Sequence, residues 1–183
     1  MNKKVGELKN IIVRYFSLIA LSFNSLFVFY LIFTPLTIYF SYFLLDYIFG
    51  ATLDYQNAVI FTGIDSVPVE IIKACIAGSA YYLLLIFNLT TPNIVLRKRL
   101  KMISFAFLAF FLANVIRIVV LTAMYISGSA FFDVTHQATW YFGSVVLVIA
   151  IWFYQVKRYN IKSIPFYSDI KFLYEHSLLK KRK

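Results

Sequence analysis

Four long apolar runs constrain this chain more than any other feature of its sequence. They cover residues 11–33, 68–89, 102–127 and 134–156. A helix needs about 20 apolar residues to cross the hydrocarbon core of a bilayer, and each run reaches that length. We therefore expect an all-α fold, a polytopic membrane helix bundle with about four transmembrane spans.

A shorter apolar stretch, residues 36–49, follows Pro35 and contains Asp46. It is too short for a span of its own, and proline interrupts helical hydrogen bonding. We expect this stretch to be an interfacial helix on the outer side or a kinked continuation of the first span.

The composition excludes the main soluble classes of protein. Hydrophobic residues make up 61% of the chain and charged residues only 14%, against ~25% charged residues in a soluble domain. These charges are too few to coat a soluble globule, and the chain is too apolar to be disordered. The net charge of +10 therefore does not indicate nucleic-acid binding, and we expect no nucleic-acid partner.

The placement of the basic residues explains this charge. With four spans, the main basic clusters all fall on one side of the membrane: Lys3, Lys4, Lys9, Arg14, Arg97, Lys98, Arg99, Lys101, Lys157, Arg158, Lys162, Lys171 and residues 180–183. Because positive charge stays in the cytoplasm, we expect both termini to be cytoplasmic. Counting 36–49 as a fifth span would put the clusters on opposite sides. The chain then divides into a membrane domain, 1–159, and a basic cytoplasmic tail, 160–183.

Arg117 is the one strong base deep within an apolar run, about 15 Å from its outer end at 1.5 Å per residue. Asn114 precedes it by three positions and shares its helix face. A charge inside the bilayer is expensive, so an intramembrane arginine is by default functional. The structural alternative is an arginine paired with an aspartate or with backbone carbonyls.

Cys75 is the only cysteine, so its thiol is free. With Ser66 as the cap and Pro68 in the first turn of its helix, Cys75 would lie two turns into the span, ~10 Å below its outer end. Small neighbours such as Ala74 and Gly78 leave room for another helix. Packing filler is the common role of such a cysteine.

His136 opens the last apolar run on the outer side. At helical spacing, His136, Trp140 and Gly143 share one face. Asp133 is expected to cap this helix or to orient the imidazole ring. The structural alternative is an interfacial histidine beside an interfacial tryptophan.

The argument for function lies in the combination. Cys75, Arg117 and His136 fall in the outer half of the bilayer on three different helices. A nearby cation favours the reactive thiolate, and acyl transfer needs an oxyanion donor and a proton shuttle. One cysteine and one nearby histidine fall short of a zinc site, so we expect no metal and no cofactor.

At these residues the chain resembles the exosortase/archaeosortase family of membrane cysteine transpeptidases, over roughly residues 66–150. The matching stretches are Ala74-Cys75-Ile76-Ala77-Gly78-Ser79, Asn114-Val115-Ile116-Arg117-Ile118, and His136 followed by Gly143. The resemblance implies a cysteine peptidase/transpeptidase of the cell membrane that recognises the C-terminal transmembrane sorting signal of secreted proteins. Such enzymes cleave near a short motif on the outer face and pass the acyl group to a membrane lipid or another acceptor.

These implications assign a role to each residue. Cys75 is the expected nucleophile, Arg117 the stabiliser of thiolate and oxyanion, and His136 the proton shuttle. Asn114 is expected to orient Arg117. The substrate helix is expected to lie on the small-residue face of Ala74 and Gly78.

Three other classes remain open at this stage. A non-enzymatic membrane scaffold or assembly protein would use Arg117 for a structural pair and Cys75 as filler. A small transporter is disfavoured, because no internal repeat appears and the spans are largely uninterrupted. Another intramembrane hydrolase would need serine-protease motifs or paired intramembrane aspartates that we do not find.

Overall fold

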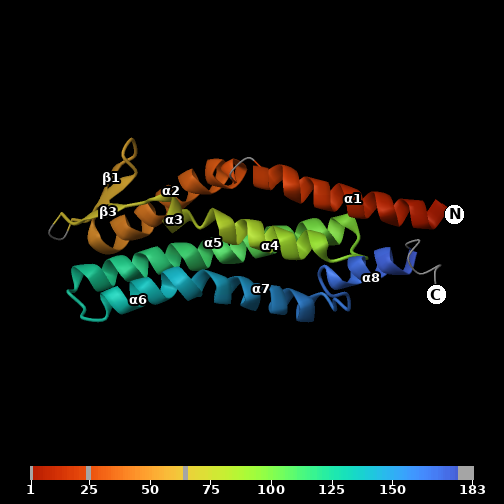
Figure 1. Cartoon of the computed structure of the whole chain (residues 1–183). Helices are drawn as coiled ribbons and strands as arrows, with labels where there is room; N and C mark the ends of the chain where they lie inside the picture. The colour runs from red at the N-terminus through yellow and green to blue at the C-terminus, as the bar shows by residue number, and fades with distance from the viewer. Residues whose placement is uncertain (1, 24–25, 64–65, 177–183) are drawn as a thin grey trace.

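The computed structural model describes residues 2–23, 26–63 and 66–176. Helices run lengthwise through the molecule, and a small sheet stands at the end opposite to both termini (Figure 1). The helices are α1 (Asn2–Phe23), α2 (Phe27–Phe49), α3 (Lys73–Ile76), α4 (Gly78–Thr90), α5 (Leu96–Ile126), α6 (Phe132–Ala138), the π-helix η1 (Thr139–Gly143), α7 (Ser144–Arg158) and α8 (Tyr167–His176). The strands are β1 (Thr52–Asp54), β2 (Val59–Phe61) and β3 (Pro68–Glu70).

Four helical segments of the described chain are long and apolar enough to cross a membrane, as the sequence predicts. They are Phe27–Phe49, Lys73–Thr90, Leu96–Ile126 and Phe132–Arg158. The last three overlap the predicted runs. Large apolar side chains on these helices, such as Leu108, Ile116 and Phe153, are exposed, as expected for helices that contact lipid.

The predicted first span, 11–33, is wrong as a single helix. Its first half lies in α1, and α2 begins only after Leu26, whose backbone is left-handed (φ 59°, ψ 19°). Residues 36–49 form the second half of α2, so the structure has a continuation and no separate interfacial helix there. Pro35 lies inside α2. Proline removes one helical hydrogen bond, but the helix continues through this position to Phe49.

Helix α5 lies at the centre of the bundle and packs against α2, α4 and α7. Aromatic rings fill the core between them. The Tyr81 ring of α4 is fully buried and stacks on Phe33 of α2, with 3.7 Å between ring centroids. Phe110 of α5 meets Tyr81 edge-on at 4.9 Å. Such edge-on and stacked pairs add to the energy of simple burial and fix the angular positions of these helices.

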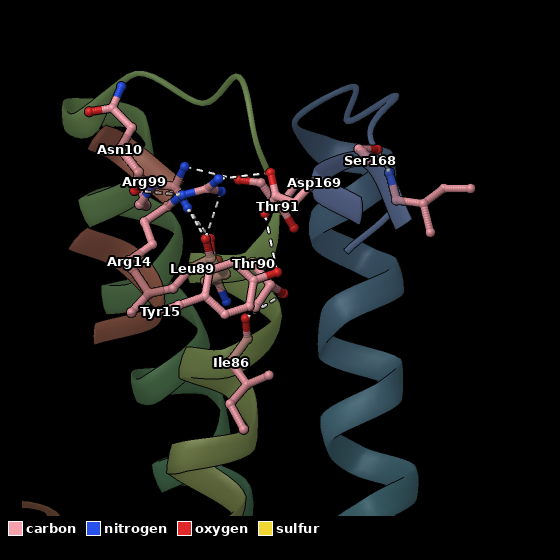
Figure 2. A network of polar contacts seen from close by, with 12 residues as sticks. Asn10, Arg14, Tyr15, Ile86, Leu89, Thr90, Thr91, Arg99, Ser168 and Asp169 are labelled. Atoms are coloured by element: carbon pink, nitrogen blue, oxygen red, sulfur yellow. Dashed lines mark hydrogen bonds and ion pairs between the residues drawn. The ribbon is translucent and has the colours of Figure 1, made fainter. Parts of the chain in front are cut away.

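A polar cluster joins four helices at the end of the bundle that lies away from the sheet (Figure 2). The Arg99 guanidinium donates hydrogen bonds to the backbone carbonyls of Leu89 (3.0 Å) and Thr91 (2.9 Å) at the end of α4. Helix ends leave such carbonyls without intrahelical donors. The Arg14 guanidinium of α1 forms a 2.8 Å ion pair with the buried Asp169 carboxylate of α8. Helices α1, α4, α5 and α8 are thereby joined where the two termini lie.

The sheet corrects another prediction. Residues 66–70 do not begin a helix, because Ser66 has a positive φ of 49° and Pro68–Glu70 is strand β3. The sheet is antiparallel with the order β1-β2-β3, and Ile60 pairs with Val69. Ile60 is fully buried and anchors the sheet to the core. Proline is tolerated on an edge strand because it lacks only an N–H group.

Candidate functional site

Cys75, Arg117 and His136 line one cavity of about 490 Å³. They come from three segments, α3, α5 and α6, that the sequence places far apart. The structure therefore brings the three predicted side chains together. The other lining residues are Tyr30, Glu70, Ile72, Lys73, Ala74, Ala77, Ser79, Trp140, Ser144 and Val145.

The backbone around Cys75 differs from the continuous helix expected from the sequence. Helix α3 is a single turn, and Ala77 then adopts a left-handed conformation (φ 55°, ψ 46°) before α4 begins. A non-glycine residue in this region costs about 1–2 kcal/mol. Cys75 thus lies on a separate turn at the start of the span rather than two turns inside it, and its half-buried thiol faces the cavity.

Asn114 holds that turn in place. Its Nδ2 atom donates a 2.7 Å hydrogen bond to the backbone carbonyl of Cys75, and its side chain is 2% exposed. The break at Ala77 ends α3, so the bond from α5 replaces an intrahelical one. We expected Asn114 to orient Arg117. In the described chain no hydrogen bond joins the two side chains, and the Asn114 amide donates to the Cys75 backbone.

The thiol has a distinct electrostatic environment. The charges of Arg117 and Glu70 both act on the sulfur. The electrostatic interaction between Arg117 and Cys75 is mutual. A guanidinium beside a thiol stabilises the thiolate relative to the thiol, and a carboxylate opposes it.

The Arg117 guanidinium has no structural partner in the described chain. Within residues 2–23, 26–63 and 66–176, no carboxylate lies at ion-pair distance from it, and its buried Nε atom has no hydrogen-bond partner. The structural alternative, an arginine held by an aspartate, is therefore not what these residues form. The charge instead faces the cavity that contains the thiol.

Aromatic rings position His136. Its imidazole stacks on Phe132 at 5.5 Å with 13° between the planes, and it meets Trp140 edge-on at 5.9 Å. Asp133 does not cap this helix, because the capping position is Phe131 and no side chain bonds there. The ring is thus oriented by aromatic packing in place of the carboxylate that the sequence suggested.

The π-helix changes which residues face the cavity. We expected Gly143 to share a face with His136 and Trp140, but Ser144 lines the cavity and Gly143 does not. The π-helix spans Thr139–Gly143, and its wider turn shifts the register by one residue. Single π-turns of this kind often occur at functional sites. No pattern in the sequence distinguishes them from ordinary helix.

The small-residue face expected to receive a substrate helix is partly occupied. Gly78 is buried, and a Cβ atom there would lie 2.8 Å from the Tyr30 ring. Tyr30 in turn carries the Lys73 ammonium 5.9 Å above its ring centroid. The prediction that Ala74 and Gly78 form an open face is therefore wrong at Gly78, while Ala74 is exposed.

Sequence reasoning missed Tyr30, Glu70, Lys73, Ser79 and Ser144 as cavity residues. The charges at Glu70 and Lys73 were a usable signal, because both precede the only cysteine within five residues. Together the cavity offers a thiol, an imidazole, two cations, a carboxylate and three hydroxyl groups. Comparisons of the chain with protein-family models, with curated proteins and with solved structures give no match, so the function is inferred from the chemistry of this cavity.

Proposed function

We propose that this protein is a membrane cysteine transpeptidase of the exosortase/archaeosortase kind. The observation that carries the proposal is one cavity lined by a free thiol, a guanidinium and an imidazole from three separate segments. Among the described residues that guanidinium has no ion-pair partner. A scaffold requires no such convergence. An arginine inside a membrane is also costly. Arg117 is half-buried and has no ion-pair or hydrogen-bond partner among the described residues, which favours a functional reason for keeping it.

The reaction has two halves. The Cys75 thiolate attacks the scissile carbonyl and forms a tetrahedral oxyanion, which the Arg117 guanidinium stabilises. The C–N bond breaks, His136 gives a proton to the leaving amine, and the acyl group remains as a Cys75 thioester. His136 then takes a proton from the acceptor hydroxyl or amine, which attacks the thioester and regenerates the thiolate.

The membrane arrangement follows from the charges. The polar cluster joins α8 to α1, and α8 lies at the end with both termini (Figure 1). Helices α3 and α6, which carry Cys75 and His136, lie towards the sheet at the other end. The positive-inside rule then puts the termini in the cytoplasm and the cavity near the outer face. The substrate is the C-terminal sorting signal of a secreted protein, whose own hydrophobic span lies beside this bundle. A membrane lipid or another amine or hydroxyl group accepts the acyl chain.

The test compares the C-termini of secreted proteins in native cells that carry the wild-type gene or Cys75→Ala. We expect proteins with a C-terminal hydrophobic span and basic cluster to be shortened only by the wild type. Ser79→Ala is the matched control, because it alters the same cavity without touching the proposed chemistry. Identical C-termini in wild-type and Cys75→Ala cells would contradict the proposal.

A further inference from the structure

We infer that strand β3 binds the substrate as an added parallel strand and delivers its scissile carbonyl to Cys75. The inference rests on the proposed function and adds how the substrate is recognised. It concerns the free edge of β3, which leads directly into the turn that carries the thiol.

The hydrogen-bond register shows which groups of β3 are free. The Val67 carbonyl accepts a bond from Thr62 N–H at 3.1 Å, and Ile71 N–H donates to the Ala58 carbonyl at 2.9 Å. Odd-numbered residues therefore face β2, and the even-numbered ones point away, since an antiparallel strand alternates. In the described chain, the Glu70 N–H and C=O and the Pro68 C=O have no partner.

This edge is continuous with the reaction centre. Ile72 is still extended (φ −84°, ψ 167°) and occupies the next outward position after Glu70. Its backbone carbonyl accepts a 2.9 Å hydrogen bond from the Cys75 N–H group. Glu70, Ile72 and Cys75 all line the same cavity. A peptide residue paired beside Glu70 would thus be followed, two residues and about 7 Å later, by a residue whose carbonyl meets the sulfur.

The occupant of this edge is an extended peptide. Unpaired backbone donors and acceptors on an edge strand recognise another backbone rather than particular side chains. The direction follows from the chain path, because β3 runs towards the Lys73–Thr90 span. A substrate whose own span follows the cleavage site runs the same way, so the pairing is parallel.

The pairing is specific enough to number the bonds. Let P1 be the residue that carries the scissile carbonyl, placed beside Ile72, so that P3 lies beside Glu70. In a parallel pair, Glu70 N–H donates to the P4 carbonyl and the P2 N–H donates to the Glu70 carbonyl. The P4 N–H donates to the Pro68 carbonyl. The P3 N–H faces away from β3.

Acetyl-tetraalanyl chloromethyl ketone and its one-residue analogue test these bonds on the full-length protein in membranes. Both alkylate Cys75, and mass spectrometry gives the rates. We expect the tetrapeptide to react about tenfold faster or more, as a few ordinary hydrogen bonds allow. N-methylation at P2 or P4 should remove most of this gain, and N-methylation at P3 should keep it. The inference would be overturned if N-methylation at P2, P3 and P4 reduced the rate gain of the tetrapeptide equally.

Glu70→Pro and Glu70→Ala form the matched protein pair. Both lose the carboxylate, but only Glu70→Pro loses the edge N–H, and Pro68 shows that the strand accepts proline at an outward position. We expect the ratio of tetrapeptide to one-residue rates to fall in Glu70→Pro relative to Glu70→Ala. Equal ratios would overturn the inference. If instead the one-residue probe fails to label Cys75 in the wild type, the proposed function itself fails.

Discussion

Asn114 and Cys75, 39 residues apart in the sequence, are joined by a 2.7 Å hydrogen bond from the Asn114 amide to the Cys75 backbone carbonyl. The bond connects the central helix α5 to the one-turn helix that presents the thiol. Because it holds the backbone rather than the sulfur, it fixes the position of Cys75 and leaves the thiol facing the cavity.

Asn114→Leu should loosen this turn. Leucine is close to asparagine in volume but donates no hydrogen bond, so the Cys75 carbonyl loses its partner at a cost of about 1–3 kcal/mol. We expect a lower midpoint of thermal unfolding in detergent and slower alkylation of Cys75. Asn114→Gln keeps the amide, so its unfolding midpoint and its rate of Cys75 alkylation should both lie closer to the wild type than those of Asn114→Leu. Equal labelling rates in Asn114→Leu and wild type would show that the bond does not position the thiol.

The left-handed residue after Cys75 gives a second prediction. Glycine adopts this conformation without the Cβ penalty, so Ala77→Gly should leave stability unchanged or raise it by up to about 1 kcal/mol. Ala77→Val should destabilise the protein by more than about 1 kcal/mol, because a β-branched residue disfavours φ 55°. Thermal unfolding of the two variants checks the sign. A valine variant as stable as the glycine variant would contradict the backbone described here.

Much of this site follows from residue chemistry and hydropathy. The apolar runs identify three of the four span-length segments, and the depths of Cys75, Arg117 and His136 place them at one end of the bundle. The helix boundaries do not follow, because residues 11–33 form one mainly apolar run, and no glycine or proline marks the break between α1 and α2. Pro35 suggests an end, yet α2 continues past it.

The details of the cavity depend on tertiary contacts that a local pattern does not contain. Alanine is the best helix former, so nothing local announces the break at Ala77. Two contacts from other helices lie beside this break: the Tyr30 ring packs on Gly78, and Asn114 of α5 donates a hydrogen bond to the Cys75 carbonyl. The strands have three residues each, too few for a clear alternation of apolar and polar positions.

The ion pair between Arg14 and Asp169, at the end of the bundle away from the cavity, gives a third prediction. Asp169→Asn keeps the shape of the side chain but removes the charge that pairs with Arg14 across a nearly buried contact. We expect α8 to detach more readily, so that trypsin cleaves after Lys171 at a higher rate. Glu175→Gln removes an exposed charge from the same helix and serves as the control. Equal cleavage in both variants would mean that the ion pair does not hold α8.

Tyr15 gives this contact a pH dependence. Burial, followed by the nearby Asp169 carboxylate and the 3.3 Å hydrogen bond to it, raises the pKa of the Tyr15 hydroxyl above its ordinary value of 10.0. The neutral hydroxyl is the form favoured in the folded protein. Its contribution to stability is therefore complete below pH ~10 and is lost as the pH rises through the folded-state pKa.

Tyr15→Phe isolates this effect from the other tyrosines. The variant should be less stable than the wild type near neutral pH, and the difference in unfolding midpoint should shrink above pH ~10. Thermal unfolding of both proteins from pH 8 to 11 measures it. A difference that stays constant over this range would exclude a titrating bond between Tyr15 and Asp169.

The central claim is that Arg117 activates Cys75, and the rate of Cys75 alkylation by iodoacetamide at neutral pH in membranes tests it most directly. No other cysteine interferes, because the chain has one. The account predicts that Arg117→Gln slows labelling about tenfold or more, the factor for ~1.4 kcal/mol of lost thiolate stabilisation. Arg117→Lys should keep part of the rate, and Ser79→Ala should keep nearly all of it. An unreactive Cys75 in the wild type, or a rate unchanged in folded Arg117→Gln, would contradict the account.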